Sequence, residues 1–270
     1  MGARHDVLFV GTERNTVYAL DADTGRTLWT ASLGTPVNRS QQSCGNVSRI
    51  GVLSTAVIDA SAGTLYAVSF TSDGSLAFKL NALDVSTGAQ RSGFPETLSP
   101  PTTNGSSFDT RVTGQRGALA FNAGRVYVPF GGLYGDCGIY HGWVVGIDAA
   151  RPSAQVAFAT PGRGSGIWGV GGPSIDDSGR LFVATGNSTP LGSSTAGSLG
   201  EFVLRLGGGA SGPTLTMTDA TAQFSPSNAR TLDVQDLDIG SMNPVVLPAV
   251  TGAPRMIFQS GKEGVMYLLN

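Results

Sequence analysis

The chain has 270 residues, 40% of them hydrophobic, which is enough for one large core or two modest ones. Its 17 basic and 19 acidic residues are nearly balanced and form no basic cluster, which argues against a nucleic-acid-binding protein. No apolar run approaches the roughly 20 residues that a membrane-spanning helix needs, and the chain start lacks the regions of a signal peptide.

Short alternating strands separated by turns recur along the whole chain. The 39 glycines and 14 prolines, with many Ser, Thr, Val and Leu, favour short strands and tight turns, and no long segment has helical periodicity. Strand-and-turn segments are predicted, in chain order, at 7–12, 17–25, 64–70, 80–88, 125–131, 143–150, 180–186, 203–208, 255–261 and 266–270. The sequence therefore predicts an all-β fold.

These segments form an internal repeat. Five of them reach an apolar residue at the same place in one pattern, and these residues are Leu20, Leu83, Ile147, Leu206 and Leu269. The four spacings between them are 63, 64, 59 and 63 residues. A unit of roughly 60 residues with three or four antiparallel strands is typical of a propeller blade, whereas a β-sandwich has no reason to keep this spacing.

The repeat predicts one β-propeller domain over residues 1–270, with about five blades of four-stranded antiparallel type. The first unit lacks a leading strand, and the chain stops at Asn270, where a further turn should begin. We therefore expect a domain that is incomplete at both ends and part of a larger ring, of about eight blades. An open fragment exposes two sheet edges, which are prone to pair with other chains.

The segment ALDADTGRTLW (19–29) matches the repeat A-x-D-x-x-T-G-x-x-x-W. It resembles the tryptophan-docking motif of quinoprotein dehydrogenase propellers, the PQQ-binding-like repeat family. Gly25 permits a tight turn whose backbone Asp21 and Thr24 can hydrogen-bond. Trp29 supplies a flat surface between neighbouring sheets. The motif indicates the fold alone, because non-catalytic scaffold propellers of the outer-membrane assembly type carry similar repeats.

A longer segment resembles the cofactor site of the quinoprotein alcohol dehydrogenases. In the family's counterpart of GIWGVGGPSIDDSGRLFVATGNSTP (166–190), a Trp forms the floor under pyrroloquinoline quinone (PQQ) and a Gly-Asn offers an amide oxygen to the metal. The resemblance implies that Trp168 is the floor and that Asn187 is the metal ligand, with calcium as the metal. The alternatives are an interblade core Trp and a turn-forming Asn.

The segment DLDIGSMNPVVLP (236–248) resembles the family's W-D-F/Y stretch. The resemblance implies that Asp238 is the catalytic carboxylate, which takes the alcohol proton as hydride leaves for the quinone. The alternative is a solvated acidic loop, since Asp233 and Asp236 lie close by in the sequence.

Two further segments resemble cofactor-binding stretches of the same family. QSGKEGVMYLL (259–269) implies that Lys262 bonds a quinone oxygen, and SCGNVSRIGV (43–52) implies that Arg49 contacts the cofactor. A lysine in a hairpin turn is otherwise simply solvated.

The cysteines depart from the family's pattern. Position 43 is Ser, so the family's adjacent Cys-Cys pair is absent. Aligning HGWVVGID leaves Cys137 where the family has the Glu that binds the metal, and Asp136 fits that role only if the loop shifts. Calcium takes roughly six to eight oxygen ligands, so the loss weakens the metal site. Because the segments of Cys44 and Cys137 border one cofactor mouth in the family, the resemblance implies a disulfide. Two buried free thiols are the alternative.

Two functional classes remain open. One is a PQQ-dependent dehydrogenase that oxidises a small-molecule alcohol, and the other is a non-catalytic propeller that binds a protein or polymer. The resemblance implies a periplasmic or extracellular protein. The sequence contains no zinc-type Cys/His spacing, nucleophile elbow or phosphate-binding P-loop.

Overall fold

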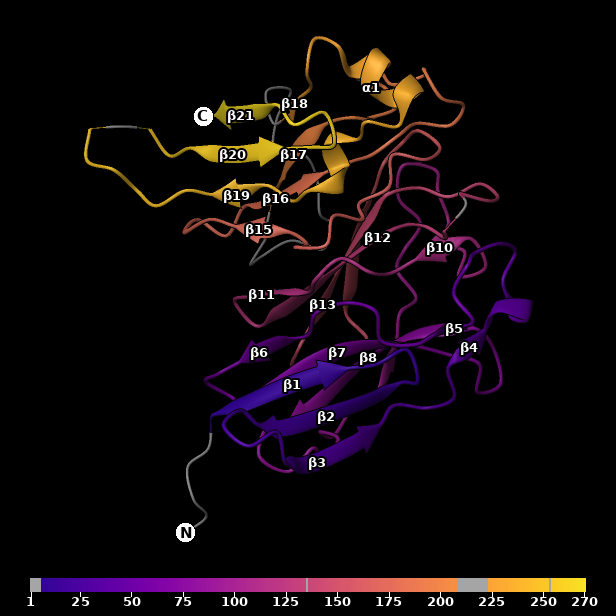
Figure 1. Cartoon of the computed structure of the whole chain (residues 1–270), viewed down its shortest axis with the longest axis vertical. Helices are drawn as coiled ribbons and strands as arrows, with labels where there is room; N and C mark the ends of the chain where they lie inside the picture. Colours follow the sequence, from indigo (N-terminus) through magenta and orange to yellow (C-terminus); the bar gives the residue numbers. More distant parts are fainter. Residues whose placement is uncertain (1–5, 135, 208–222, 253) are drawn as a thin grey trace.

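A computed structural model of the chain describes residues 6–134, 136–207, 223–252 and 254–270. Five antiparallel sheets follow one another along the chain. Figure 1 shows them as an open fan, with the N-terminal sheet at the bottom and the C-terminal sheet at the top. The structure confirms the all-β, propeller-type fold that the repeat predicts.

Each sheet contains strands that are consecutive in sequence. The first consists of β1 (Val7–Gly11), β2 (Thr16–Asp21) and β3 (Thr27–Ser32). The second consists of β6 (Val57–Asp59), β7 (Thr64–Thr71), β8 (Ala77–Asp84) and β9 (Glu96–Thr97). The third consists of β11 (Ala120–Asn122), β12 (Arg125–Gly132), β13 (Trp143–Asp148) and β14 (Gln155–Ala159), with β10 (Thr113–Gly114) also paired to β12.

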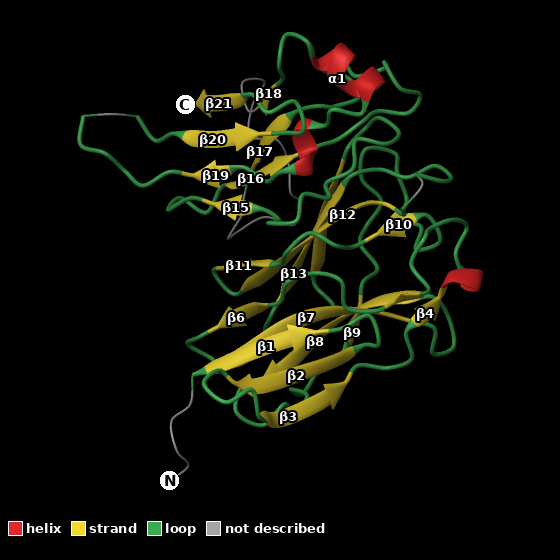
Figure 2. Ribbon diagram, in the orientation of Figure 1, coloured by secondary structure: helices red, strands yellow, loops and turns green. Residues whose placement is uncertain are grey.

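The last two sheets continue the series. The fourth consists of β15 (Ser174–Ile175), β16 (Leu181–Ala184), β17 (Val203–Leu206) and β18 (Gln223–Phe224). The fifth consists of β19 (Val245–Val246), β20 (Ile257–Ser260) and β21 (Met266–Leu269). A separate ribbon pairs β4 (Val37–Asn38) with β5 (Arg49–Ile50). Figure 2 shows how little helix the described residues contain: α1 (Ala229–Gln235) and two 3₁₀ turns, at 39–41 and 239–241.

The short first strands lie at the inner side of the fan. β6 contacts β11, β11 contacts β15, and β15 contacts β19. These contacts place the innermost strands of four successive sheets beside one another, as the blades of a propeller require. The loops that leave these strands are therefore brought together from distant parts of the sequence.

The docking motif behaves as its residue types predict. Oδ1 of Asp21 accepts hydrogen bonds from the main-chain N–H of Thr24 (2.9 Å) and from its hydroxyl (2.7 Å). Gly25 has a φ of 70°, which glycine adopts without strain. The indole N–H of Trp29 donates to the carbonyl of Val85 (3.0 Å) in the next unit, so the ring joins the first two sheets.

Burial distinguishes the inner sheets from the outer two. Every residue of β7 is buried, because neighbouring sheets cover both of its faces. The first and last sheets each expose one apolar face, on which Leu8 is 56% and Leu268 is 61% exposed. No helix among the described residues is long and apolar enough to cross a membrane.

Candidate functional site

Asp238 is the centre of a polar cluster built from separate segments. It is only 2% exposed and lies directly before the 3₁₀ turn at 239–241. Its Oδ1 accepts a 2.9 Å hydrogen bond from the main-chain N–H of Asn187, which follows β16. Its Oδ2 accepts a hydrogen bond from Nζ of Lys262, which follows β20. The cluster therefore joins the fourth sheet to the fifth.

Asp236 completes this cluster, and the sequence motifs did not identify it. It ends α1 in the left-handed conformation, with φ of 56°. The side-chain amide of Asn187 donates to its Oδ1 (2.9 Å), and Nζ of Lys262 lies 3.1 Å from its Oδ2. All four carboxylate oxygens of the two aspartates thus have a partner on Asn187 or Lys262.

Trp168 lies against the same cluster. Nζ of Lys262 is 5.5 Å from the centroid of the Trp168 ring. Gly186 fills the space between the ring edge and the carboxylate: a Cβ there would lie 2.6 Å from both Nε1 of Trp168 and Oδ1 of Asp238. The structure therefore brings together four of the predicted site residues, Trp168, Asn187, Asp238 and Lys262.

The turn that follows Asn187 is held by another carboxylate. Asp233, which is completely buried, accepts hydrogen bonds from the main-chain N–H groups of Ser188, Gly192 and Ser194. The side chain of Asn187 is therefore not needed to hold this turn, and its amide N–H donates to Asp236 instead. Its Oδ1 is buried without a hydrogen-bond partner. An orphaned amide oxygen of this kind is costly unless a ligand uses it.

Glu201 supports the cluster from within the protein. It is completely buried, and its Oε2 accepts a 2.7 Å hydrogen bond from the N–H of Ile239, the residue after Asp238. Burial raises the pKa of Glu201 to about 8, and the negative charges of Asp238 and Asp233 add to the rise. Glu201 is therefore mainly a neutral acid at pH 7.

The two aspartates and the lysine have shifted pKa values. Burial raises the pKa of Asp238, against the hydrogen bond and charge of Lys262. Burial also opposes ionisation of Asp236, but hydrogen bonds from Lys262 and Asn187 outweigh it and lower that pKa. Burial works against the ammonium of Lys262, yet its bonds to the two carboxylates raise its pKa. Lys262 is thus firmly protonated.

The arginine beside the cluster is Arg116 rather than Arg49. Arg49 is exposed on β5 and, within the described residues, its side chain has no hydrogen bond or ion pair. Arg116 lies with Cζ 4.6 Å from the Trp168 ring centroid and 4.9 Å from that of Tyr134. Burial lowers the pKa of Arg116, which has no ion pair to any residue that the structure describes. Its segment matches none of the family motifs described above, so Arg116 could not be predicted from the sequence.

Cys44 and Cys137 form a disulfide between the loop before β5 and the loop between β12 and β13. The bond fixes Cys137 where the family has its metal-binding Glu. Neighbouring Asp136 does not supply the missing ligand, because it lies against Tyr140, whose pKa burial and Asp136 both raise. The described residues contain no group of three or more His, Cys, Asp or Glu side chains suited to a metal.

These observations decide which groups the site fits. The orphaned Oδ1 of Asn187 is a suitable oxygen ligand, but the aspartates beside it are occupied by Lys262, and the described residues add no third carboxylate to make a metal-binding group. The residues therefore do not fit the calcium site of the family. The flat ring of Trp168, with the cations of Arg116 and Lys262 over it, offers an aromatic surface and positive charge that suit a planar anionic ligand such as PQQ, which would take the place of the guanidinium on the ring.

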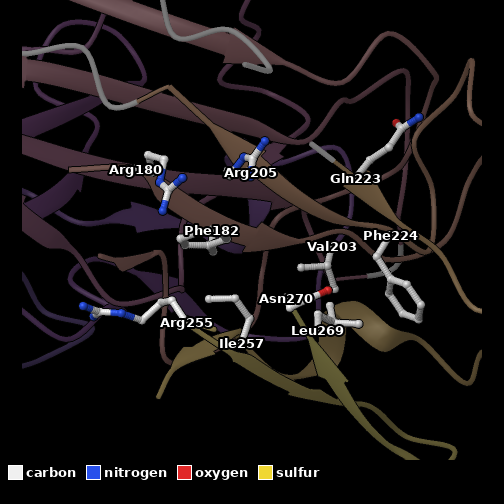
Figure 3. Close-up of a pocket in the computed structure, with 10 residues that line it drawn as sticks. All are labelled: Arg180, Phe182, Val203, Arg205, Gln223, Phe224, Arg255, Ile257, Leu269 and Asn270. Carbon is white, nitrogen blue, oxygen red and sulfur yellow. The ribbon is translucent and has the colours of Figure 1, made fainter. Parts of the chain in front are cut away.

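Figure 3 shows a different cavity, of about 110 Å³, between the fourth and fifth sheets. Arg180, Arg205 and Arg255 lie toward one end of it, and apolar side chains such as Val203, Phe224 and Leu269 lie toward the other. Arg180 and Arg255 are already paired with Asp176 and Asp177. Cofactor pockets usually measure roughly 300–1,000 Å³, so this cavity is too small for a quinone cofactor.

Comparison with known proteins identifies relatives of the chain. A PQQ-like repeat family model described as outer membrane protein assembly factor BamB matches residues 1–189. None of the curated proteins matches. Quinohemoprotein alcohol dehydrogenase from Comamonas testosteroni is 18% identical, with a TM-score of 0.65 over 98% of this chain and 40% of that one.

Two further solved structures are similar. A quinohemoprotein alcohol dehydrogenase from Pseudomonas putida is 18% identical, with a TM-score of 0.64 over 97% of this chain and 38% of that one. A europium-containing methanol dehydrogenase is 17% identical, with a TM-score of 0.61 over 97% of this chain and 46% of that one. This chain spans less than half the length of each relative, and at these identities the likeness establishes the fold alone.

Proposed function

The chain belongs to the PQQ-like repeat family, and from this premise we propose that it is a PQQ-dependent dehydrogenase-like propeller that oxidises an alcohol. One observation carries the proposal. Trp168, Asn187, Asp238 and Lys262 match family motifs in three separate segments, and contacts join all four around one buried carboxylate. A chance match of a turn residue or a surface lysine would give no such convergence.

Three side chains would hold the quinone. Trp168 offers a flat ring, while Arg116 and Lys262, whose cations now lie over that ring, would pair with the anionic groups of PQQ. The N–H groups of Arg116 have no hydrogen-bond partner among the residues that the structure describes, so a ligand carboxylate can take them. When bound, PQQ supplies an acceptor for hydride.

Asp238 would serve as the base. Lys262 keeps it ionised, while burial makes it more basic than an exposed aspartate. The alcohol hydroxyl would donate to a remaining lone pair of an Asp238 oxygen and transfer its proton there. Asn187 and Lys262 fix the carboxylate through one hydrogen bond to each oxygen, so it needs little reorganisation.

The test separates binding from chemistry. Titration of the protein with PQQ should quench tryptophan fluorescence, less so in Trp168→Phe. Alcohol-dependent dye reduction should then be lost in Asp238→Asn and kept in Asp177→Asn, a matched change at an exposed aspartate. Equal rates in wild type and Asp238→Asn would eliminate the dehydrogenase role.

A second candidate is a non-catalytic propeller that binds a protein or polymer. The disulfide at the position of the family's metal-binding Glu favours it, because that substitution removes a ligand of the catalytic metal. In this case the Asp238–Lys262 ion pair only holds two sheets together. Failure of the protein to bind PQQ would favour this function.

We also propose that the five sheets belong to a larger ring outside the cytoplasm. Leu8 and Val10 are exposed on the first sheet, and Met266 and Leu268 on the last. Apolar faces of this kind are covered by a neighbouring sheet within a propeller, as those of β7 are here. The disulfide fits an oxidising compartment.

A further inference from the structure

We infer that the ammonium of Lys262 occupies the cation position of the cluster formed by Asn187, Asp236 and Asp238, so that this cluster holds no divalent metal while Lys262 is in place. The family implies calcium at such a site, and the residues of this chain disagree with it. The inference goes beyond the proposed function, because it concerns the protein without quinone and is tested without it.

The ammonium of Lys262 bridges the two carboxylates of the cluster. Its Nζ contacts Oδ2 of both Asp236 and Asp238. The remaining oxygen of each aspartate accepts an N–H of Asn187 (2.9 Å each). A divalent ion that bound both carboxylates would lie where the ammonium now bridges them. Repulsion between the two cations prevents simultaneous occupation at that point.

The residues around the cluster supply few further oxygen ligands for a metal. To displace the ammonium, a hard cation would need several more oxygens than the cluster offers. Cys137 stands in a disulfide at the family's Glu position, and Asp136 lies against Tyr140 instead. Glu201 is mainly neutral and directs one oxygen to the N–H of Ile239. Among the described residues, the cluster thus has two carboxylates, which one ammonium already partly neutralises.

Removing the ammonium should allow a metal ion to bind at the cluster. In Lys262→Met, the Oδ2 atoms of Asp236 and Asp238 lose their cation, and Oδ1 of Asn187 is already free of a partner. Two adjacent carboxylates, one of them largely buried, are stabilised by a bound cation, which competes there with protonation of one of the pair. The variant is therefore expected to gain a metal site that the wild type lacks.

The experiment uses chelator-treated protein without PQQ, titrated with terbium or calcium alone. An ion at the Lys262 position would lie near Trp168, whose ring centroid is 5.5 Å from Nζ, so tryptophan excitation should sensitise terbium luminescence. We expect no saturable signal from wild type and a saturable signal from Lys262→Met. Calcium should raise the Tm of the variant and leave that of the wild type unchanged.

Controls come from the same chain. Lys79 is the other lysine of the sequence, and Lys79→Met should behave like wild type. Lys262→Met/Asp238→Asn should lose the gained signal. If Lys262→Met does not fold, Lys262→Gln replaces it, and the wild-type titration stands by itself. A wild-type signal that Asp238→Asn abolishes would overturn the inference, and so would a folded Lys262 variant that binds neither ion. Neither result depends on whether PQQ binds.

Discussion

The main-chain N–H of Asn187 donates a 2.9 Å hydrogen bond to Oδ1 of Asp238, although 51 residues separate the two in the chain. The bond connects the end of β16 with the segment before the fifth sheet. It forms because Gly186, directly before Asn187, has no Cβ and so leaves room for the carboxylate. The backbone at 186–187 therefore positions the base.

Gly186→Ala should disrupt this arrangement. The added Cβ would lie 2.6 Å from Oδ1 of Asp238 and from Nε1 of Trp168. Asp238 is buried and cannot move away without breaking its hydrogen bonds to Asn187 and Lys262. We expect a loss of about 1–3 kcal/mol in the free energy of unfolding, as overpacking usually costs, and weaker PQQ binding. Urea unfolding measures the change in the free energy of unfolding. Gly197→Ala, which meets only Thr195 Oγ1 at 3.6 Å, is the control and should be nearly neutral.

Much of the fold was predictable because the repeat is regular. The residues aligned with Leu20 recur at even spacing, and the Asp21–Thr24–Gly25 turn forms as its residue types require. The sequence missed β4, β5, β9, β10 and β18, because two-residue strands are too short to show alternation, and the predicted segments also leave out the longer β3 and β14. It also missed α1, whose seven residues make barely two turns.

The site was predictable only where a family motif covered it. Trp168, Asn187, Asp238 and Lys262 lie in such motifs, and the structure joins them. Asp236 and Arg116 reach the site through the end of α1 and through a loop before β11, and contacts of this kind between distant segments leave no local pattern. Arg49 matches a motif but lies exposed, so its cofactor role remains a prediction without support from contacts.

Glu201 should make stability depend on pH. Its pKa is about 8 in the folded protein against an ordinary 4.5, so between these values the folded state binds a proton that the unfolded state lacks. Stability from this group is complete below about pH 4.5 and falls as pH rises to about 8. The total is several kcal/mol, at about 1.4 kcal/mol per pKa unit.

Glu201→Gln removes this titration and keeps an oxygen for the N–H of Ile239. The stability of the variant relative to wild type should therefore increase steadily as pH rises from 5 to about 8. Urea unfolding of both proteins at several pH values measures the difference. A difference that does not change with pH would show that Glu201 titrates normally.

The disulfide should stabilise the fold. It joins residues 93 positions apart, and closing so long a loop restricts the unfolded chain. Cys44→Ser/Cys137→Ser should lower the free energy of unfolding by about 2–4 kcal/mol. Unreduced, denatured wild type should contain no reactive thiol. Two reactive thiols, or equal stability of the two proteins, would contradict the prediction.

The exposed apolar faces should make this 270-residue chain self-associate. Leu268 is 61% exposed on β21, so Leu268→Lys should reduce association in sedimentation velocity. Because the side chain is at the surface, the Tm should hardly change. Val170→Lys, at an equally exposed loop position, is the control and should leave association unchanged. If both variants associate like wild type, the outer sheet faces are not responsible.

Substitutions of Arg116 and of Arg49 should affect quinone binding differently. Arg116 has its guanidinium carbon 4.6 Å from the Trp168 ring centroid and pairs with no acid among the described residues, so a carboxylate of PQQ would gain a charge-assisted hydrogen bond there. Such bonds contribute roughly 1.5–3 kcal/mol, so Arg116→Met should weaken PQQ binding by about tenfold to a hundredfold. Arg49→Met should change affinity less than Arg116→Met, since no contact among the described residues joins the exposed Arg49 to the cluster. Fluorescence titration of the three proteins with PQQ measures both effects. Tighter binding by Arg116→Met would show that the guanidinium covers the ring and must be displaced before the quinone can stack.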